Sequence, residues 1–194
     1  MHHPGTSSGA TRAGLMVGCS VHGHVTEALA RFAQAGGHDF VPVTTTIKTL
    51  PPRPRGLLGW LRKQRLVWQN RRFMARFPET HFLRDDSAFL TELSKHDLIV
   101  TGRFHAVCLA VLSGTPFIAV SSNSWKIEAL IKDIGLDSAR ICSLRELTQQ
   151  TISERDWDYS DLERAAIAET LARWRKTGSM LFDDIAALTT GRSI

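Results

Sequence analysis

Arg103 and His105 are separated by one residue and directly follow the apolar run 98–101. A guanidinium group can hold a carboxylate or a phosphate through two parallel hydrogen bonds. An imidazole can transfer a proton near neutral pH. The pair therefore predicts a site that binds an anion and moves a proton. A structural interpretation remains open, in which Arg103 pairs with a nearby acid and His105 is solvated.

The elements around this pair are expected to place it at a ligand-binding edge. The run 98–101 is typical of a buried strand, and 104–112 is predicted to be a helix that ends at Gly114. Arg103 and His105 then lie where a strand ends and a helix begins, which is where open parallel sheets bind ligands. The start of a helix also favours anions. Gly102 allows close approach of the backbone to a ligand.

A second polar loop follows the next expected strand, 117–120. Because parallel strands end at the same edge of a sheet, this loop should border the same crevice. An alternative is that Ser124 only caps the following helix, 126–134. The loop adds these candidate ligand-binding residues: Ser121, Ser122, Asn123 and Lys126.

Neither the histidines nor the cysteines form a metal-binding pattern. His22 and His24 follow the first expected strand but lack a third partner, and we expect them to be solvated. The three cysteines are isolated in the sequence and show no paired spacing. We therefore expect neither a metal nor an organic cofactor.

Strands and helices alternate along the chain. An apolar run at 14–19, a helix at 25–35 and a β-branched run at 40–46 form a β-α-β unit. The pattern predicts an α/β fold, namely a Rossmann-like, open and mostly parallel sheet with helices on both faces. The remaining expected elements are a helix at 56–77, a strand at 81–83, a helix at 87–94 and a strand at 139–142. A capping signature, Ser160 with Glu163, starts a long last helix that could break at Gly178 and Ser179.

The 194 residues are expected to form one domain over 13–194 after a flexible tail, 1–12. This domain would carry a basic insertion at 48–77 and C-terminal helices from about 160. With neither a secretory signal nor an apolar run of the roughly 20 residues that span a membrane, the expected location is the cytoplasm.

The net charge of +5 is concentrated in one segment. Nine Lys or Arg residues and no acidic residue lie between Lys48 and Arg76, which indicates an anionic partner. Trp60 and Trp68 lie among these charges. The helix at 56–77 could pack its tryptophans on the sheet, or lie on an anionic membrane surface at the inner face, or bind a second chain. No nucleic-acid-binding module is recognisable, so a nucleic-acid partner is not expected.

An ordered set of motifs resembles the polysaccharide pyruvyl transferase family. It comprises 101–106 (TGRFHA), 113–118 (SGTPFI), 126–128 (KIE) and 134–136 (IGL). The resemblance implies one half of a two-domain fold of the GT-B glycosyltransferase type. It also implies transfer of a pyruvyl group from phosphoenolpyruvate to saccharide hydroxyls, as a cyclic ketal, in the biosynthesis of cell-surface or exopolysaccharides.

The same resemblance implies roles for individual residues. Arg103 and His105 would contact phosphoenolpyruvate, with Arg103 holding its phosphate or carboxylate and His105 acting as general acid. Lys126 would add positive charge to the donor pocket. The acceptor would be a saccharide, and a lipid-linked saccharide would suit a membrane-bound helix.

Family members are roughly twice as long as this chain, and nothing here matches their amino-terminal half. The wall that binds the acceptor could be missing, come from another chain, or be replaced by the insertion at 51–76. Two rival functions therefore remain. One is a GT-B-type glycosyltransferase that uses a nucleotide sugar, and the other is a non-catalytic truncated paralogue that binds a partner or a membrane surface.

Overall fold

Five parallel strands form a single sheet in the computed structural model of the chain, which describes residues 12–42, 56–83, 85–121 and 125–189. The strand order is β2-β1-β3-β4-β5, and every described pairing is parallel. The strands are β1 (Leu15–Ser20), β2 (Asp39–Phe40), β3 (Leu98–Gly102), β4 (Phe117–Val120) and β5 (Ile141–Cys142). The helices are α1 (Gly23–Gly36), α2 (Gly56–Arg76), α3 (Asp86–Leu93), α4 (Phe104–Ser113), α5 (Lys126–Ile134), α6 (Gln149–Ser153) and α7 (Asp161–Thr189).

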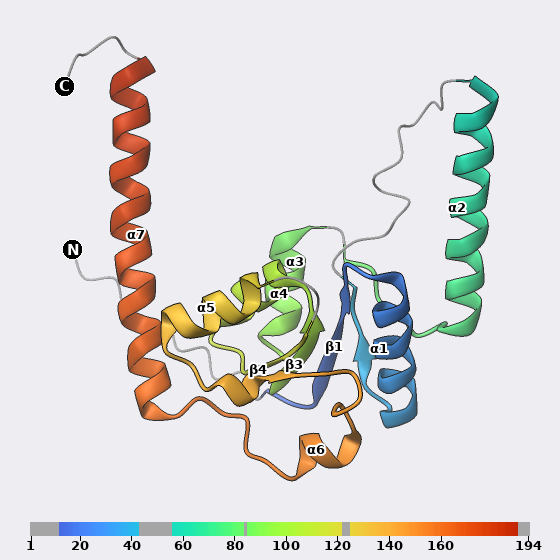
Figure 1. Ribbon diagram of the computed structural model, residues 1–194, viewed down its shortest axis with the longest axis horizontal. Coiled ribbons are helices and arrows are strands. Elements are labelled where there is room, and N and C mark those ends of the chain that lie inside the picture. The colour runs from blue at the N-terminus through green and yellow to red at the C-terminus, as the bar shows by residue number, and fades with distance from the viewer. Residues whose placement is uncertain (1–11, 43–55, 84, 122–124, 190–194) are drawn as a thin grey trace.

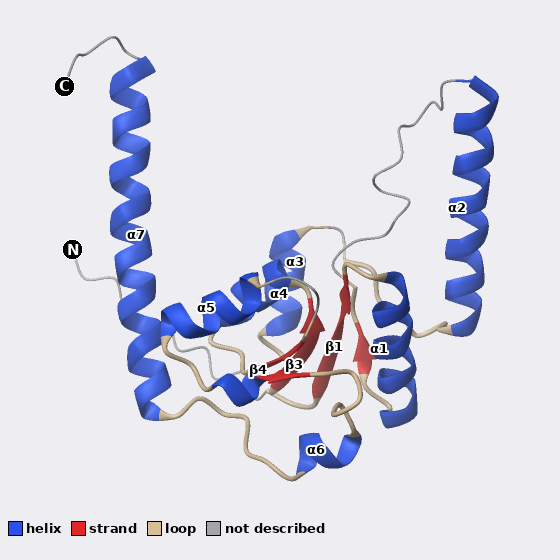
Figure 2. Ribbon diagram, in the orientation of Figure 1, coloured by secondary structure: helices blue, strands red, loops and turns tan. Residues whose placement is uncertain are grey.

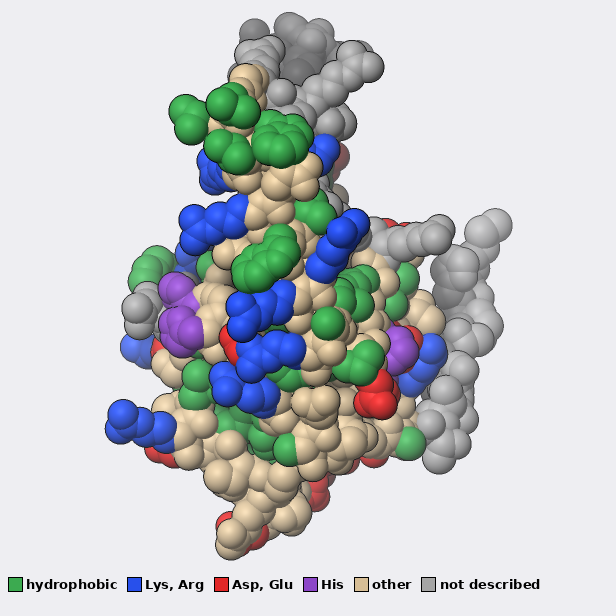
Figure 3. All heavy atoms as spheres, turned by 90° about the vertical axis from the view of Figure 1, so that its right-hand side faces the viewer, with side chains coloured by type: hydrophobic (Ala, Val, Ile, Leu, Met, Phe, Trp, Pro, Cys, Tyr) green, Lys and Arg blue, Asp and Glu red, His purple; other side chains and the backbone are tan. Residues whose placement is uncertain are grey.

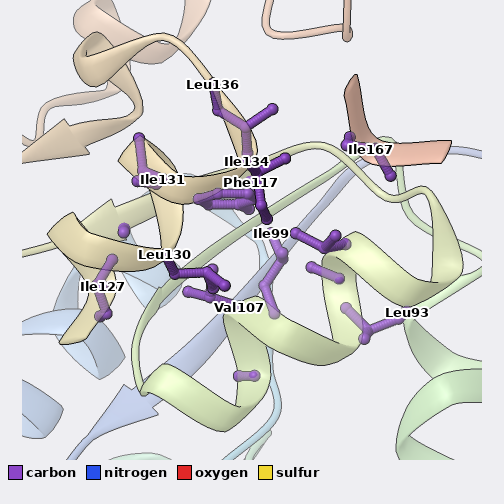
Figure 4. Packing of buried hydrophobic residues seen from close by; sticks show 14 of the residues in the cluster. Leu93, Ile99, Val107, Phe117, Ile127, Leu130, Ile131, Ile134, Leu136 and Ile167 are labelled. Carbon is purple, nitrogen blue, oxygen red and sulfur yellow. The ribbon is translucent and has the colours of Figure 1, made fainter. Parts of the chain in front are cut away.

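Helices cover both faces of the sheet (Figures 1 and 2). Because side chains alternate along a strand, Met16 and Ile99 point to one face while Val17 and Val100 point to the other. The first face packs against α3, α4, α5 and the start of α7, as Figure 4 shows for part of that core. The second packs mainly against α1, with contributions from α6 and from the end of α2. The predicted open parallel sheet with helices on both faces is confirmed.

Glycines end three of the helices as the sequence indicated. Gly37, Gly114 and Gly135 follow α1, α4 and α5 with φ values of 64°, 65° and 83°. This left-handed conformation carries little steric cost for glycine, and it lets the backbone N–H bond back to the last turn. These stops fix where each helix returns to the sheet.

Three predicted strands differ from expectation. The strand expected at 139–142 is only Ile141–Cys142, because Ser138–Arg140 form a short 3-10 helix. Of the strand expected at 40–46, β2 covers only Asp39–Phe40 and does not continue through Val41 and Pro42, while 43–46 lie outside the described residues. In place of the strand expected at 81–83 there is a single parallel bridge between Thr80 and Phe40. Phe40 belongs to a two-residue strand at the edge of the sheet, so few backbone groups remain there to pair with a further strand.

The last helix differs from expectation because it does not break. α7 continues through Gly178 and Ser179 to Thr189. A glycine inside a helix costs only about 1 kcal/mol relative to alanine, which is too little to end a long helix. The predicted capping signature is confirmed, since Ser160 Oγ accepts from the Glu163 N–H at 3.2 Å and Glu163 accepts from the Ser160 N–H at 3.0 Å.

A buried ion pair ties the start of α7 to the sheet. Arg140 is 2% exposed, and its Nε and Nη2 donate to the two carboxylate oxygens of Glu163 at 2.8 and 2.9 Å. Arg140 also donates to the carbonyl of Trp157 at 2.9 Å and lies over the ring of Tyr159. These bonds hold the residues between β5 and α7 against the sheet.

The helix α2 differs most from the usual arrangement of a globular domain. None of its residues is buried, and Leu58 and Trp68 are 83% and 58% exposed. The alternative in which its tryptophan face packs on the sheet is therefore wrong. Near its C-terminal end, α2 attaches to the core on the α1 side of the sheet. There Phe73 packs against Phe77 and Phe40, with ring centroids 4.9 and 6.1 Å apart. No helix in the described part of the chain is both long and apolar enough to cross a membrane.

Candidate functional site

The strand order creates a switch point between β1 and β3. From these two neighbouring strands the chain continues toward opposite edges of the sheet, which leaves a crevice at their carboxyl ends. Ser20, the last residue of β1, pairs with Gly102, the last residue of β3. Leu15 pairs with Leu98 at the start of the two strands. The register then shifts between Val17 and Ser20, and this shift brings Ser20 opposite Gly102.

An open cavity of about 540 Å³ lies at this point, within the size range of small-molecule sites. It is bounded by the end of β1, the start of α1, the second half of α2 and the first residue after β3. Its lining residues are Cys19, Ser20, Val21, Gly23, Thr26, Glu27, Pro42, Leu66, Trp68, Gln69, Asn70, Arg72, Phe73, Arg76, Phe82 and Arg103. Three arginines and one glutamate among them make the cavity net positive.

Arg103 occupies the position that the sequence predicted. It precedes α4 in an extended conformation, and its N–H donates to Thr101 Oγ1 at 3.2 Å. Thr101 Oγ1 in turn donates to the buried carbonyl of Cys19 at 3.1 Å. The Arg103 Nε donates to Cys19 Sγ at 3.3 Å. These contacts fix the base of a half-buried guanidinium that lines the cavity.

His105 is not brought into the cavity with Arg103. It lies in the first turn of α4, is exposed, and makes an edge-on contact with the ring of Phe104 at a centroid distance of 5.7 Å. The α4 side chains that face the core are Ala106, Val107, Ala110 and Val111. His105 thus shares a helix start with Arg103 but points to solvent.

The small size of Gly102 has a different structural reason from the one expected. A Cβ atom at this position would lie 2.8 Å from both Cβ and Oγ of Ser20. The close approach is therefore made by the side chain of the neighbouring strand. Gly102 itself is buried.

The loop after β4 lies only partly within the described residues. Ser121 is exposed, and its N–H donates to the carbonyl of Cys142 at 2.8 Å. Lys126 is exposed at the start of α5, next to the exposed Trp125. Neither Ser121 nor Lys126 is among the described residues that line the cavity. Ser122 and Asn123, with the expected cap Ser124, lie outside the described residues.

The two histidines after β1 lie beside the cavity. Their rings stack with centroids 5.8 Å apart, and His22 is the residue before α1. Of this turn, Val21 and Gly23 line the cavity. In the described part of the chain, no three His, Cys, Asp or Glu side chains are grouped so that they could hold a metal ion.

The second half of α2 supplies residues of the cavity. The insertion at 51–76 was one alternative for the wall that binds the acceptor, but none of its residues was assigned individually. Arg72 and Arg76 line the cavity, with Arg72 lying over the Trp68 ring at 5.4 Å and Arg76 paired with Glu27 of α1. Ser20 was also missed, although it ends β1 just as Arg103 follows β3. The rule that parallel strands end at one edge would have found Ser20, whereas no local signal brings α2 to this site.

The whole of α2 is basic. Figure 3 shows Lys and Arg side chains along it, below a group of apolar side chains. The helix has no acidic residue and has these basic ones: Arg62, Lys63, Arg65, Arg71, Arg72 and Arg76. Positive potential therefore extends from the cavity along the projecting helix.

Comparisons with known proteins connect part of this site with a family. No curated protein matches the sequence. Among solved structures, the chain is similar to one described as the glycotransferase of kitacinnamycin, with 14% identity and a TM-score of 0.40. The similarity covers 87% of this chain but 38% of that chain, so this chain spans well under half the length of that protein. Residues 70–124, which contain Arg103 and His105, match the model of the polysaccharide pyruvyl transferase family, and the resemblance inferred from the sequence is confirmed for that segment.

Proposed function

We propose that this chain is the donor-binding part of a polysaccharide-modifying transferase that moves a pyruvyl group from phosphoenolpyruvate to a saccharide. The observation that carries the proposal is the position of Arg103, which lies in the family segment and lines a positively charged cavity at the switch point. Phosphoenolpyruvate carries two anionic groups on three carbons. A cavity with Arg72, Arg76 and Arg103 suits such a compact polyanion.

The reaction in this proposal joins two sugar hydroxyls to C2 of the donor. The first hydroxyl oxygen bonds to C2 while C3 gains a proton, and the second bonds to C2 as the C2–O bond to phosphate breaks. The products are a cyclic ketal and inorganic phosphate. Arg103 would neutralise the donor. The resemblance implied His105 as the general acid, but His105 points away from the cavity, so in this scheme the proton on C3 comes from solvent in the open cavity. No metal or organic cofactor has a step in this scheme.

Titration calorimetry with two kinds of donor tests this proposal. We expect saturable binding of phosphoenolpyruvate and none of nucleotide sugars at the same concentrations, because Arg103 of the cavity lies in the segment that matches the pyruvyl transferase family model. Saturation by a nucleotide sugar alone would favour the glycosyltransferase alternative. Binding of neither donor would favour the non-catalytic paralogue.

The exposed helix α2 supports a membrane surface as partner. Leu57, Leu58, Trp60 and Leu61 are exposed at its first turns, beside basic side chains. Basic residues near an anionic bilayer contribute about 1 kcal/mol each, and Trp and Leu side chains insert at the interface. In this proposal α2 lies on the inner face of the membrane, where lipid-linked saccharide acceptors would reach the cavity.

Co-sedimentation with liposomes across a salt series checks this attachment. We expect the protein to sediment with anionic liposomes at low salt, to be released as salt rises, and to ignore neutral liposomes. Trp60→Ala should weaken binding about 10-fold, since an interfacial aromatic side chain contributes on the order of 1–2 kcal/mol. Phe182→Ala, at the equally exposed apolar end of α7, should leave it unchanged. If the protein forms dimers without liposomes, and Trp60→Ala dissociates them, α2 would instead be the interface with a second copy of the chain.

A further inference from the structure

The side chain of Ser20 is the one polar group of the cavity that is both deeply buried and unsatisfied among the described residues. Ser20 is 3% exposed and lines the cavity, and its Oγ has no hydrogen-bond partner. Its backbone is fully engaged, since Thr26 Oγ1 accepts from the Ser20 N–H at 3.1 Å and donates to the Ser20 carbonyl at 3.0 Å. A buried hydroxyl without a partner is costly. A ligand atom at this wall of the cavity would supply the missing partner.

The start of α1 adds uncapped N–H groups at the same wall. α1 begins at Gly23, only three residues after Ser20, and Gly23 lines the cavity. The preceding residue, His22, makes no side-chain capping bond. The first N–H groups of a helix lack partners within the helix, and a helix of 14 residues carries a partial positive charge at this end.

The cross-strand register brings these groups next to Arg103. Ser20 pairs with Gly102, whose missing side chain leaves room for the Ser20 hydroxymethyl group. Arg103 follows Gly102 directly and contacts Cys19, the residue before Ser20. The hydroxyl, the helix start and the guanidinium are therefore adjacent parts of one cavity.

We propose that the turn between β1 and α1 is a distinct phosphate subsite, formed by Ser20 Oγ and the first N–H groups of α1. This inference rests on the proposed function and deepens it, because it divides the two anionic groups of the donor. The phosphate lies at the α1 start, and Arg103 takes the carboxylate. As the C2–O bond breaks, its electron pair stays on the departing phosphate, whose growing charge the helix start stabilises, and the proton of the second hydroxyl leaves with it as hydrogenphosphate.

Ser20→Ala tests the subsite with inorganic phosphate as the probe. A hydrogen bond to a charged group contributes enough that its loss should weaken phosphate binding about 10- to 100-fold. The melting temperature should stay level or rise by about 2–4 °C, because the variant removes an unsatisfied buried hydroxyl. Ser179→Ala, an exposed serine on α7, is the matched control and should change neither value. A purely structural role for Ser20 would instead lower the melting temperature and leave phosphate affinity intact.

The possible outcomes separate this inference from the proposed function. The subsite is overturned if wild type and Ser20→Ala bind phosphate with equal affinity, or if the wild type binds no phosphate at millimolar concentration. This conclusion holds whether or not the protein binds phosphoenolpyruvate. If Ser20→Ala binds phosphate more weakly but the wild type does not bind phosphoenolpyruvate, the phosphate subsite is supported and phosphoenolpyruvate is rejected as the donor. If Ser20→Ala folds poorly, Ser20→Gly removes the same hydroxyl without adding volume and is judged by the same phosphate titration.

Discussion

Replacement of Arg103 by alanine is expected to abolish measurable phosphoenolpyruvate binding while leaving the fold intact. Two charge-assisted hydrogen bonds to a carboxylate would be lost, which corresponds to at least about a 100-fold fall in affinity. The fold should survive because the guanidinium lines an open cavity and its backbone N–H, which bonds to Thr101, is unchanged by the substitution. Calorimetric titration measures the affinity, and thermal unfolding measures the stability.

Two further variants make this result specific. Arg103→Lys keeps the charge but loses the planar fork, and it should recover only part of the affinity. Arg173→Ala removes an exposed arginine of α7 and should bind the donor like the wild type. Unchanged affinity in Arg103→Ala would remove the donor site from this cavity.

The second large effect is expected on stability, from the ion pair between Arg140 and Glu163. Its two side chains are 2% and 11% exposed. Glu163→Ala leaves a guanidinium buried without its carboxylate, which typically costs about 3–5 kcal/mol. The pair of Lys95 with Glu92 has the same distance of 2.8 Å, yet its side chains are 59% and 25% exposed. Glu92→Ala is therefore the matched control, with an expected loss below about 1 kcal/mol. Urea unfolding of both variants measures the difference, and equal losses would contradict the importance of burial.

The same pair predicts how stability depends on pH. The hydrogen bonds from Arg140 lower the pKa of Glu163 from 4.5 to about 2. A carboxyl group whose pKa is lower in the folded state stabilises the fold fully above its unfolded pKa. This contribution, on the order of 3 kcal/mol, is lost as the pH falls from about 5 through 2. Glu163→Gln cannot titrate, so its free energy of unfolding should fall less steeply over this range. A wild-type profile as flat as that of the variant would show that the pair does not form.

Local signals predicted most of the sheet and its helices. β4 and α5 begin and end where the sequence indicated, because an apolar run and a glycine stop are properties of neighbouring residues. The continuity of α7 was not predictable in the same way. The cost of Gly178 is set against the cooperativity of the whole helix, and a local view overstates that cost.

The candidate site was predicted for one strand but not for its neighbours. The position of Arg103 follows from the order of strand and helix alone. Ser20 was missed because its importance depends on register, that is, on its pairing with Gly102 and on a hydroxyl without a partner. Arg72 and Arg76 were outside reach because they approach β1 from about fifty residues along the chain, through a contact between Phe73 and Phe40.

Because α2 projects from the domain, the two walls of the cavity differ in how strongly the fold depends on them. The wall made by β1, α1 and Arg103 contains buried residues, Cys19 and Ser20, that pack within the fold. The opposite wall belongs to a helix with no buried residue, and its side chains at Gln69 and Asn70 can vary with little penalty to the rest of the molecule. Under the proposed function, acceptor preference could therefore be engineered at Gln69 and Asn70 while Ser20 and Arg103 stay unchanged.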